Sequence, residues 1–351
     1  MAQDAETGAE RGTRASLRPP SDGRVNHLSA LAALHLVTIF VLVSLVFFLP
    51  RALPGDPLNA LLDPEVGGTF TAEARAELEA HYQLDRPLGE QYVRYLGRMA
   101  TLDFGWSISR QSPVSSLIAA RLPWTLLLMG LALTFAAAIS WLAGTTSAWR
   151  RGSRSDRALV AVLTLARSVP DFAIATILLI VFAVLVPVLP VAGNRTVFAQ
   201  YTSIWQEAGD VTAHLILPVS ALTIGLLGSK FLLVRNSVIG SLGQEYMMLA
   251  RAKGLPIRVQ KYRHAGRNAL LPFLTLLGVQ FGFAVGGSIF VEEVFTYPGM
   301  GTLILDAVDA RDYPLLEAVF LVLAATVLMA NFVVDLIYTW LDPGVSTGAR
   351  S

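Results

Sequence analysis

Long apolar runs without charged residues, separated by short polar segments, dominate this chain. They predict six membrane-spanning helices, because about 20 apolar residues in a helix cross a hydrocarbon core of roughly 30 Å. The predicted spans are 29–49, 122–146, 158–186, 214–234, 269–291 and 315–341. Residues 1–28, rich in charge and proline, predict a disordered cytoplasmic tail, and 344–351 a second tail. The first apolar run begins too late and is too long for a cleavable signal peptide.

The third run, 158–186, is longer than one span needs and contains Pro170, so it predicts either one kinked crossing or two short ones. Basic residues collect on the cytoplasmic side of membrane proteins. A single crossing places the arginine-rich segments 150–157 and 245–267 on one side and the acidic segment 292–314 on the other. We therefore predict one kinked crossing, with both termini in the cytoplasm.

Two polar segments are expected outside the membrane. Segment 50–121 is amphipathic and predicts two surface helices separated near Asp85–Pro87. Segment 187–210 is polar and poor in bases. At the opposite end of the fourth span, Lys230 and Arg235 mark the cytoplasmic side, where long basic side chains can reach the interface.

Composition supports an all-α integral membrane protein. The chain has 351 residues, 54% of them hydrophobic and 15% charged, with a mean hydropathy of +0.55. Its net charge of +1 is uninformative as a total, because the charges are sorted by segment, and nothing in the sequence suggests a nucleic-acid partner. The absence of cysteine excludes disulfides, thiolate metal sites and cysteine nucleophiles.

The cytoplasmic loop 241–268 is a basic insert between two apolar runs. Its pattern predicts a short helix, a turn and a second short helix. Gly254 can end the first helix in a left-handed conformation, and Pro256 suits the first turn of the second.

This loop resembles the "EAA" loop of membrane subunits of ABC importers, with Glu245, Ala250, Gly254, Leu271 and Pro272 in its characteristic places. Further motifs resemble the first permease of the dipeptide, oligopeptide and nickel branch. In chain order these are LPGDP, LDRPLGEQY, DFGWS, VEEVFTYPGMG, ARDYP and LDP. Together the resemblance covers about residues 29–343.

The resemblance implies the six-helix permease fold of type I (MetI-like) ABC importers, in the cytoplasmic membrane of a prokaryote. The expected domains are the tail 1–28, the first helix 29–49, an extracytoplasmic segment 50–121, a five-helix permease domain 122–343 and the tail 344–351. The expected partners are a second homologous permease, two ATP-binding subunits that bind ATP and Mg, an external solute-binding protein and membrane lipid. Peptides are the leading cargo, followed by nickel complexes and oligosaccharides.

In this family the loop couples the permease to its ATPase. The residues expected to do so here are Glu245, Tyr246, Leu249, Ala250, Arg251, Ala252, Lys253, Gly254, Leu255, Pro256, Arg263 and His264.

The chain itself shows no catalytic, cofactor-binding or metal-binding pattern. Its nearest approach to a nucleotide-binding loop, GLLGSK at 225–230, lacks the required spacing and lies inside a span. The five histidines are scattered without metal-ligand spacing. We therefore expect a transport subunit and not an enzyme.

Two charges in the third span are candidates for a translocation path or gate. Arg167 and Asp171 flank Pro170 and are four residues apart, so on one helix they would share a face and could pair. The alternative is a structural ion pair at the proline kink. Asn331 and Asp335, similarly spaced in the sixth span, favour a packing role.

A different class of function remains open at this point. A secondary transporter of a small polar solute would work without an ATPase. It would show inverted repeats and matching broken spans, but only the third span is clearly broken.

Overall fold

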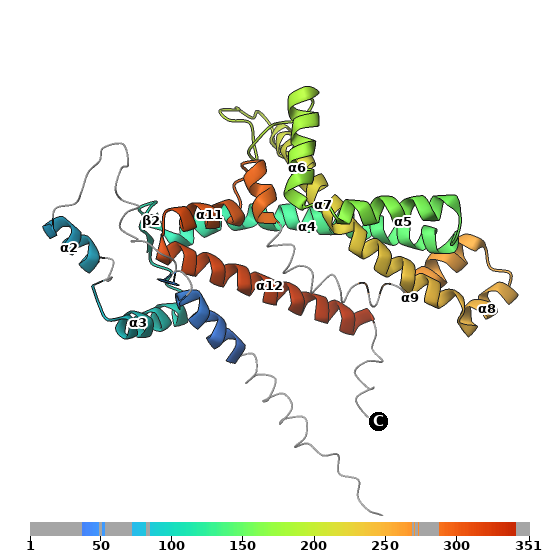
Figure 1. Cartoon of the computed structure of the whole chain (residues 1–351), viewed down its shortest axis with the longest axis horizontal. Coiled ribbons are helices and arrows are strands. Elements are labelled where there is room, and N and C mark those ends of the chain that lie inside the picture. Colours follow the sequence, from blue (N-terminus) through green and yellow to red (C-terminus); the bar gives the residue numbers. More distant parts are fainter. Residues whose placement is uncertain are drawn as a thin grey trace, which may run out of the picture. The chain divides into compact units, whose positions relative to one another are not determined.

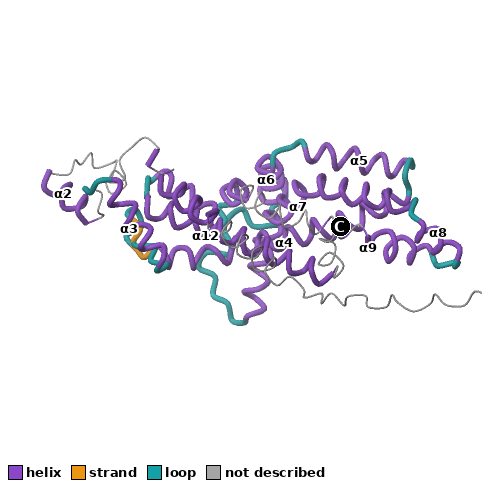
Figure 2. The backbone as a smooth tube through the Cα atoms, turned by 90° about the horizontal axis from the view of Figure 1, so that it is seen from below, coloured by secondary structure: helices purple, strands orange, loops and turns teal. Residues whose placement is uncertain are grey.

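The computed structural model describes residues 37–48, 51–52, 72–81, 85–268, 270, 273 and 288–341 (Figure 1). By its contacts the chain divides into residues 1–45 and 46–351. In the first unit, residues 37–45 are helical. Every labelled element belongs to the second unit, in which helix predominates and strand occurs only in one short hairpin among the described residues (Figure 2).

Segment 50–121 contains the two predicted helices, α2 (Ala72–His81) and α3 (Leu88–Ala100). Pro87 directly precedes α3, where its fixed φ favours a helix start. A two-stranded antiparallel hairpin, β1 (Trp106–Ser107) with β2 (Ser112–Pro113), follows α3. The sequence did not predict this hairpin, because strands of two residues carry no alternating pattern.

Two long helices form the main pair, α4 (Val114–Trp149) and α7 (Ile204–Leu242). Both begin before the apolar runs that predicted them. Ser203 caps α7 by accepting a hydrogen bond from the backbone N–H of Gln206, so the helix starts in a polar stretch.

The third apolar run is not a single kinked helix. It forms α5 (Arg154–Arg167), then α6 (Asp171–Leu179) continued by the π-helical η2 (Ile180–Leu185), with a 98° bend between the two parts. Pro170 explains the break, because it has no backbone N–H to donate and restricts the residue before it. The bent pair is either a broken span or a re-entrant loop.

The rest of the described chain is also helical. Loop 241–268 contains α8 (Glu245–Ala252), η3 (Val259–Ala265) and α9 (Gly266–Asn268). After a helical stretch at 288–294 come α11 (Met300–Asp309), which the sequence did not predict, and α12 (Tyr313–Leu341), close to the predicted sixth span.

Some predictions fall on residues that the structure does not describe. Of the predicted first span 37–48 is described, and of the fifth only 270, 273 and 288–291. The two predicted tails, together with Leu271 and Pro272, lie outside the described residues, as do the side chains of Asn331 and Asp335.

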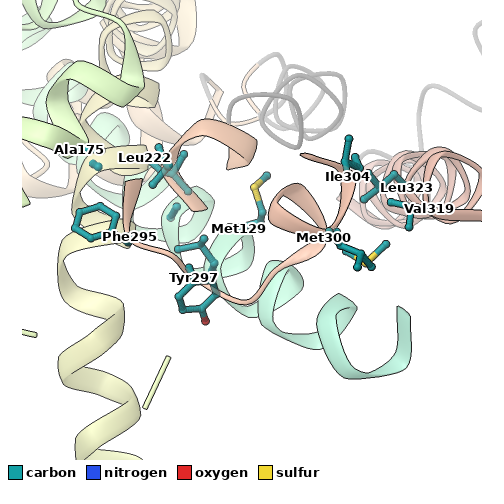
Figure 3. Packing of buried hydrophobic residues seen from close by; sticks show 14 of the residues in the cluster. Met129, Ala175, Leu222, Phe295, Tyr297, Met300, Ile304, Val319 and Leu323 are labelled. Carbon is teal, nitrogen blue, oxygen red and sulfur yellow. The ribbon is translucent and has the colours of Figure 1, made fainter. Parts of the chain in front are cut away.

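Three described helices, within α4, α7 and α12, are long and apolar enough to cross a membrane, or four if the bent pair is one span. A large apolar core joins α4, α6, α7, the 288–294 helix, α11 and α12. Figure 3 shows side chains of this cluster, including Met129, Leu222 and Phe295. A smaller cluster contains Ala148, Val234, Val238, Met247, Ala265 and Phe273.

Candidate coupling loop and charged helix break

The turn between α8 and the next helix has the predicted geometry. Gly254 has φ +63°, the left-handed region that favours glycine. The N–H of Gly254 donates to the carbonyl of Arg251 at 2.9 Å, and that of Leu255 donates to the carbonyl of Ala250 at 3.3 Å. These two bonds form a Schellman motif, which satisfies carbonyls that a helix end would leave unpaired.

The second helix starts at the proline. The carbonyl of Pro256 accepts from the N–H groups of Val259 at 2.9 Å and Gln260 at 3.1 Å. The Gln260 side chain donates back to the carbonyl of Leu255 at 2.6 Å. Because each end of the turn is hydrogen-bonded, the loop is a defined structure and not an irregular connection.

The predicted coupling residues divide into two groups. Ala250 is buried, and Tyr246 packs against the smaller core around Met247 and Val238. Leu255 and His264 are half-buried. The exposed group contains Glu245, Leu249, Arg251, Ala252, Lys253, Gly254, Pro256 and Arg263.

Three large apolar side chains at this tip face solvent. Met248 is 59% exposed, Leu249 55% and Ile257 63%. Arg251, Lys253 and Arg258, also exposed, surround them. We call the set Met248, Leu249, Arg251, Lys253, Ile257 and Arg258 the loop tip. Met248, Ile257 and Arg258 were not among the predicted coupling residues, because helical spacing alone does not tell which side of a short helix is covered.

Polar contacts attach the second half of the loop to α4. Thr146 of α4 accepts a hydrogen bond at Oγ1 from Lys261 Nζ at 2.9 Å, and its hydroxyl lies 3.3 Å from the Tyr262 hydroxyl. Trp141 Nε1 donates to the carbonyl of Gly266 at 3.2 Å, and the Trp141 and Tyr262 rings are 5.5 Å apart. The loop is therefore held to the C-terminal end of α4 at several points.

Asp156 joins the turn after α4 to α7. Its carboxylate accepts from Arg235 Nε and Nη2, each at 2.8 Å, from the N–H of Gly152 at 2.9 Å and from the Ser147 hydroxyl. The Asp156 side chain is 3% exposed and that of Arg235 17%. The hydrogen bond from Arg235 holds the pKa of Asp156 well below its usual range. The sequence showed Asp156 only as one acid among arginines.

The helix break separates the two charges that were expected to share a face. Arg167 ends α5 and Asp171 begins α6, and they form no ion pair. Asp171 instead lies against Gly225 of α7, where a Cβ would be 1.8 Å from its Oδ1, and its charge interacts with that of Lys230. Lys230 is fully buried within the protein, so the prediction that it extends to the membrane interface is wrong.

Arg167 packs on a different glycine of α7 from Asp171. Its stem packs on Gly228, where a Cβ would be 2.8 Å from the Arg167 Cβ and 2.5 Å from the carbonyl oxygen of Leu163. The Arg167 side chain is exposed and makes no hydrogen bond or ion pair within the described residues. Glycines at 225 and 228 thus allow both sides of the break to approach α7 closely.

Comparison with known proteins identifies the family. Residues 136–347 match the model of the binding-protein-dependent transport system inner membrane component. A peptide permease protein of Brucella ovis is 39% identical over 88% of this chain and 94% of its own length. The oligopeptide transport system permease protein AppB of Bacillus subtilis is 35% identical over 86% and 93%. The chain belongs to this permease family.

Another relative agrees with the assignment. The glutathione transport system permease protein GsiC of Escherichia coli is 34% identical over 88% of the chain and 94% of its own length. Among solved structures, a crystal structure of an amino acid ABC transporter with histidines aligns with 64% of the chain and 94% of its own length, at 17% identity and a TM-score of 0.45.

Family membership decides several expectations. The chain is an inner-membrane transport subunit and not an enzyme, and the alternative of a secondary transporter without an ATPase is set aside. The expected fold class, an all-α type I importer permease, is confirmed apart from the short hairpin. In the described part of the chain no three His, Asp or Glu side chains gather as metal ligands would.

Motifs that carried the resemblance have structural roles in the permease. In VEEVFTYPGMG, Glu292 is buried and accepts from the Thr125 hydroxyl at 2.8 Å and the N–H of Gly301 at 2.6 Å, at the start of α11. Gly299 leaves room for this carboxylate, since a Cβ there would be 2.3 Å from Glu292 Oε2.

The DFGWS and ARDYP motifs meet each other. Asp312 of ARDYP accepts from the hydroxyls of Ser107 at 2.6 Å and Ser109 at 2.8 Å, and from the N–H of Ser109 at 2.9 Å. Its other oxygen accepts from the N–H of Leu315 at 3.1 Å and caps α12. The hairpin is therefore fixed to the start of α12.

Proposed function

We propose that this permease imports di- or oligopeptides, with a second homologous permease beside it, two ATP-binding subunits docked beneath the pair and an external solute-binding protein delivering cargo. The peptide cargo is supported by the names of similar proteins, which are permeases for peptides, oligopeptides and glutathione. ATP and Mg would bind the ATPase subunits. Both termini would lie in the cytoplasm, on the side of the arginine-rich loops.

The loop tip is the observation that carries the coupling proposal. A monomeric soluble surface rarely gathers apolar side chains of this size at one protruding turn. The tip combines the three exposed apolar side chains with Arg251, Lys253 and Arg258, and has no acid beyond Glu245 at the start of α8. A cytoplasmic partner with an apolar groove and an acidic rim fits this surface, as an ATPase subunit would.

The contacts behind the tip supply a route for movement. Met247 belongs to the smaller core against α4 and α7, and Lys261 and Tyr262 contact Thr146 on α4. ATP would favour the closed ATPase pair, and a loop held at both faces would transmit that preference to the spans as a coupling free energy.

The external side would receive the binding protein. Segments 50–121 and 292–314 are the expected docking region, and the Asp312 contacts hold the hairpin and the start of α12 together there. Arg167, Pro170 and Asp171 would border the path or its gate. Cargo selection would rest mainly with the binding protein.

The test is purification of the tagged permease from native membranes, with mass spectrometry of its partners and an ATPase assay. A second permease and ATP-binding subunits are the expected partners. Recovery of this chain alone, or only with copies of itself, would contradict the proposal.

Gly254→Val tests the loop within the purified complex. Nothing lies within 4 Å of a Cβ at Gly254, so the substitution acts only on the left-handed backbone, at a cost of about 1–2 kcal/mol. Gly243→Val is the matched control, because Gly243 is also unobstructed but has φ −91°. We expect import driven by ATP to fall several-fold in Gly254→Val only. Equal import by both variants would show that this turn does not couple.

A further inference from the structure

Arg167 is an exposed charge inside an apolar run, without a partner in the described part of the chain. The predicted spans that the structure mostly leaves undescribed, 29–49 and 269–291, contain no acidic residue, and the acid among the undescribed side chains of the sixth span is Asp335. Charged side chains within membrane spans face the bundle interior or water-filled cavities, because exposure to lipid costs several kcal/mol.

The depth of Arg167 can be estimated from the Asp156–Arg235 pair near the cytoplasmic side. Arg167 is 11 residues along α5 from Asp156, about 16 Å at 1.5 Å per residue. Gly228, which packs on Arg167, is seven residues along α7 from Arg235, about 10 Å. Arg167 thus lies about 10–16 Å inward of that pair, well inside a core of roughly 30 Å.

The helix break gives a second, independent indication that the surface around Arg167 does not face lipid. Ser168 and Pro170 interrupt the helix and are exposed, like Arg167. Non-helical backbone is tolerated at membrane depth only where it is covered by protein or lines water. Of the neighbouring charges, Lys230 is fully buried and Asp171 is half-buried against Gly225 of α7. Of these three charges, Arg167 is the one presented outward.

We propose that Arg167 faces the aqueous translocation route and binds the terminal carboxylate of peptides as they pass. The proposal rests on the peptide cargo proposed above. A guanidinium suits this role because it stays charged and can bind a carboxylate with two parallel hydrogen bonds. Asp171 is a positioning residue that packs the break against Gly225 of α7, so the guanidinium is presented from a fixed helix end.

The first experiment measures contact with water. The chain has no cysteine, so Arg167→Cys and Leu165→Cys each introduce a single thiol. Leu165 is a matched control, 69% exposed and two residues away on the same helix. In the full complex in liposomes, we expect the water-soluble 2-sulfonatoethyl methanethiosulfonate to modify the thiol at position 167 and not the one at 165, measured by the mass of this chain. No modification at 167 would overturn the aqueous position.

The second experiment measures whether peptide import depends on the positive charge at position 167. Import of trialanine by the complex should fall about tenfold in Arg167→Cys, the factor that corresponds to 1.4 kcal/mol. Treatment with 2-aminoethyl methanethiosulfonate restores a positive charge and should restore import, whereas the sulfonatoethyl reagent should not. Wild-type complex treated in the same way corrects for cysteines in the other subunits. Unchanged import in Arg167→Cys, or equal rescue by both reagents, would overturn the carboxylate role.

Different results would contradict the peptide-cargo proposal and the proposal about Arg167. A wild-type complex that hydrolyses ATP but imports no alanine peptide would overturn the peptide cargo and the carboxylate role together. The labelling experiment requires no transport, so it would still decide whether Arg167 faces water.

Discussion

At the residue scale, single carboxylates join parts of the permease that are far apart in sequence. Asp156 holds Arg235, Glu292 holds Thr125 and the start of α11, and Asp312 holds Ser107. Each has backbone N–H or hydroxyl donors in addition to any charged partner, as a buried acid requires to be stable.

Asp156→Asn should weaken the fold around the cytoplasmic ends. It leaves Arg235, 17% exposed, without its bidentate partner, and we expect a loss of roughly 2–3 kcal/mol. The measurement is thermal unfolding of the purified complex in detergent. Glu90→Gln, which disrupts exposed pairs with Arg86 and Arg94, is the control and should change little.

The pH dependence of this effect has a definite sign. The folded-state pKa of Asp156 is lowered, so its stabilisation is complete above the unfolded value of 3.8 and is lost as pH falls through the folded value. The difference between wild type and Asp156→Asn should therefore be constant from about pH 8 to about pH 5. A difference that shrinks within that interval would show that the pKa is not lowered.

Glu292→Ala should destabilise the external end. The buried N–H of Gly301 and the hydroxyl of Thr125 would lose their acceptor and a cavity would form, for an expected loss of about 2–4 kcal/mol. Glu293→Ala is a matched control, since Glu293 is the next residue along the chain and lies outside the buried set. Similar melting temperatures for the two variants would contradict the assigned role of Glu292.

At the scale of helices and turns, features that depend on a residue's own backbone could be predicted from the sequence. Features that depend on contacts between residues far apart in the chain could not. Gly254 and Pro256 specified the turn after α8 because both act through their own backbone. Pro170 signalled a break, but its 98° angle depends on Gly225 and Gly228, more than 50 residues later. The partner of Asp156 lies 79 residues away, beyond any spacing rule.

Thr146→Val tests whether α4 receives movement from the coupling loop. It removes the acceptor of Lys261 and the contact to the Tyr262 hydroxyl, while valine keeps the shape. We expect ATP hydrolysis to persist and import per ATP to fall about two- to fivefold, as for a lost hydrogen bond of about 0.5–1 kcal/mol. Thr134→Val is the control, because its hydroxyl bonds only the carbonyl of Gly130 in the same helix. Equal coupling in both variants would exclude this contact.

At the scale of the whole molecule, α4 connects the two sides of the permease. Its 36 residues extend about 54 Å, more than a membrane core is thick. Trp141 and Thr146 contact the coupling loop near one end, and Thr125 bonds Glu292 and the N–H of Met300 toward the other. A shift of the loop therefore has a continuous helix through which to reach Glu292 and the start of α11.

The sidedness of the loops can be measured with single cysteines, because the native chain has none. Ser155→Cys and Ala252→Cys should react with a membrane-impermeant maleimide only after permeabilisation, because the arginine-rich loops belong in the cytoplasm. Val197→Cys and Asp309→Cys, both at exposed positions, should react in intact cells.

Position 197 also decides between the two forms of the bent pair. If α5 and α6 make one broken crossing, residue 197 is external and the Val197→Cys variant reacts in intact cells. If they form a re-entrant loop, the chain returns to the cytoplasmic side and that variant reacts only after permeabilisation, while Ser155→Cys behaves the same in both cases. With a re-entrant loop, every later loop would change sides. The basic 245–267 loop would then lie outside, against the distribution of its charges. We therefore expect labelling at position 197 from outside, and protection there would refute both the six-span topology and the ATPase-facing position of the loop tip.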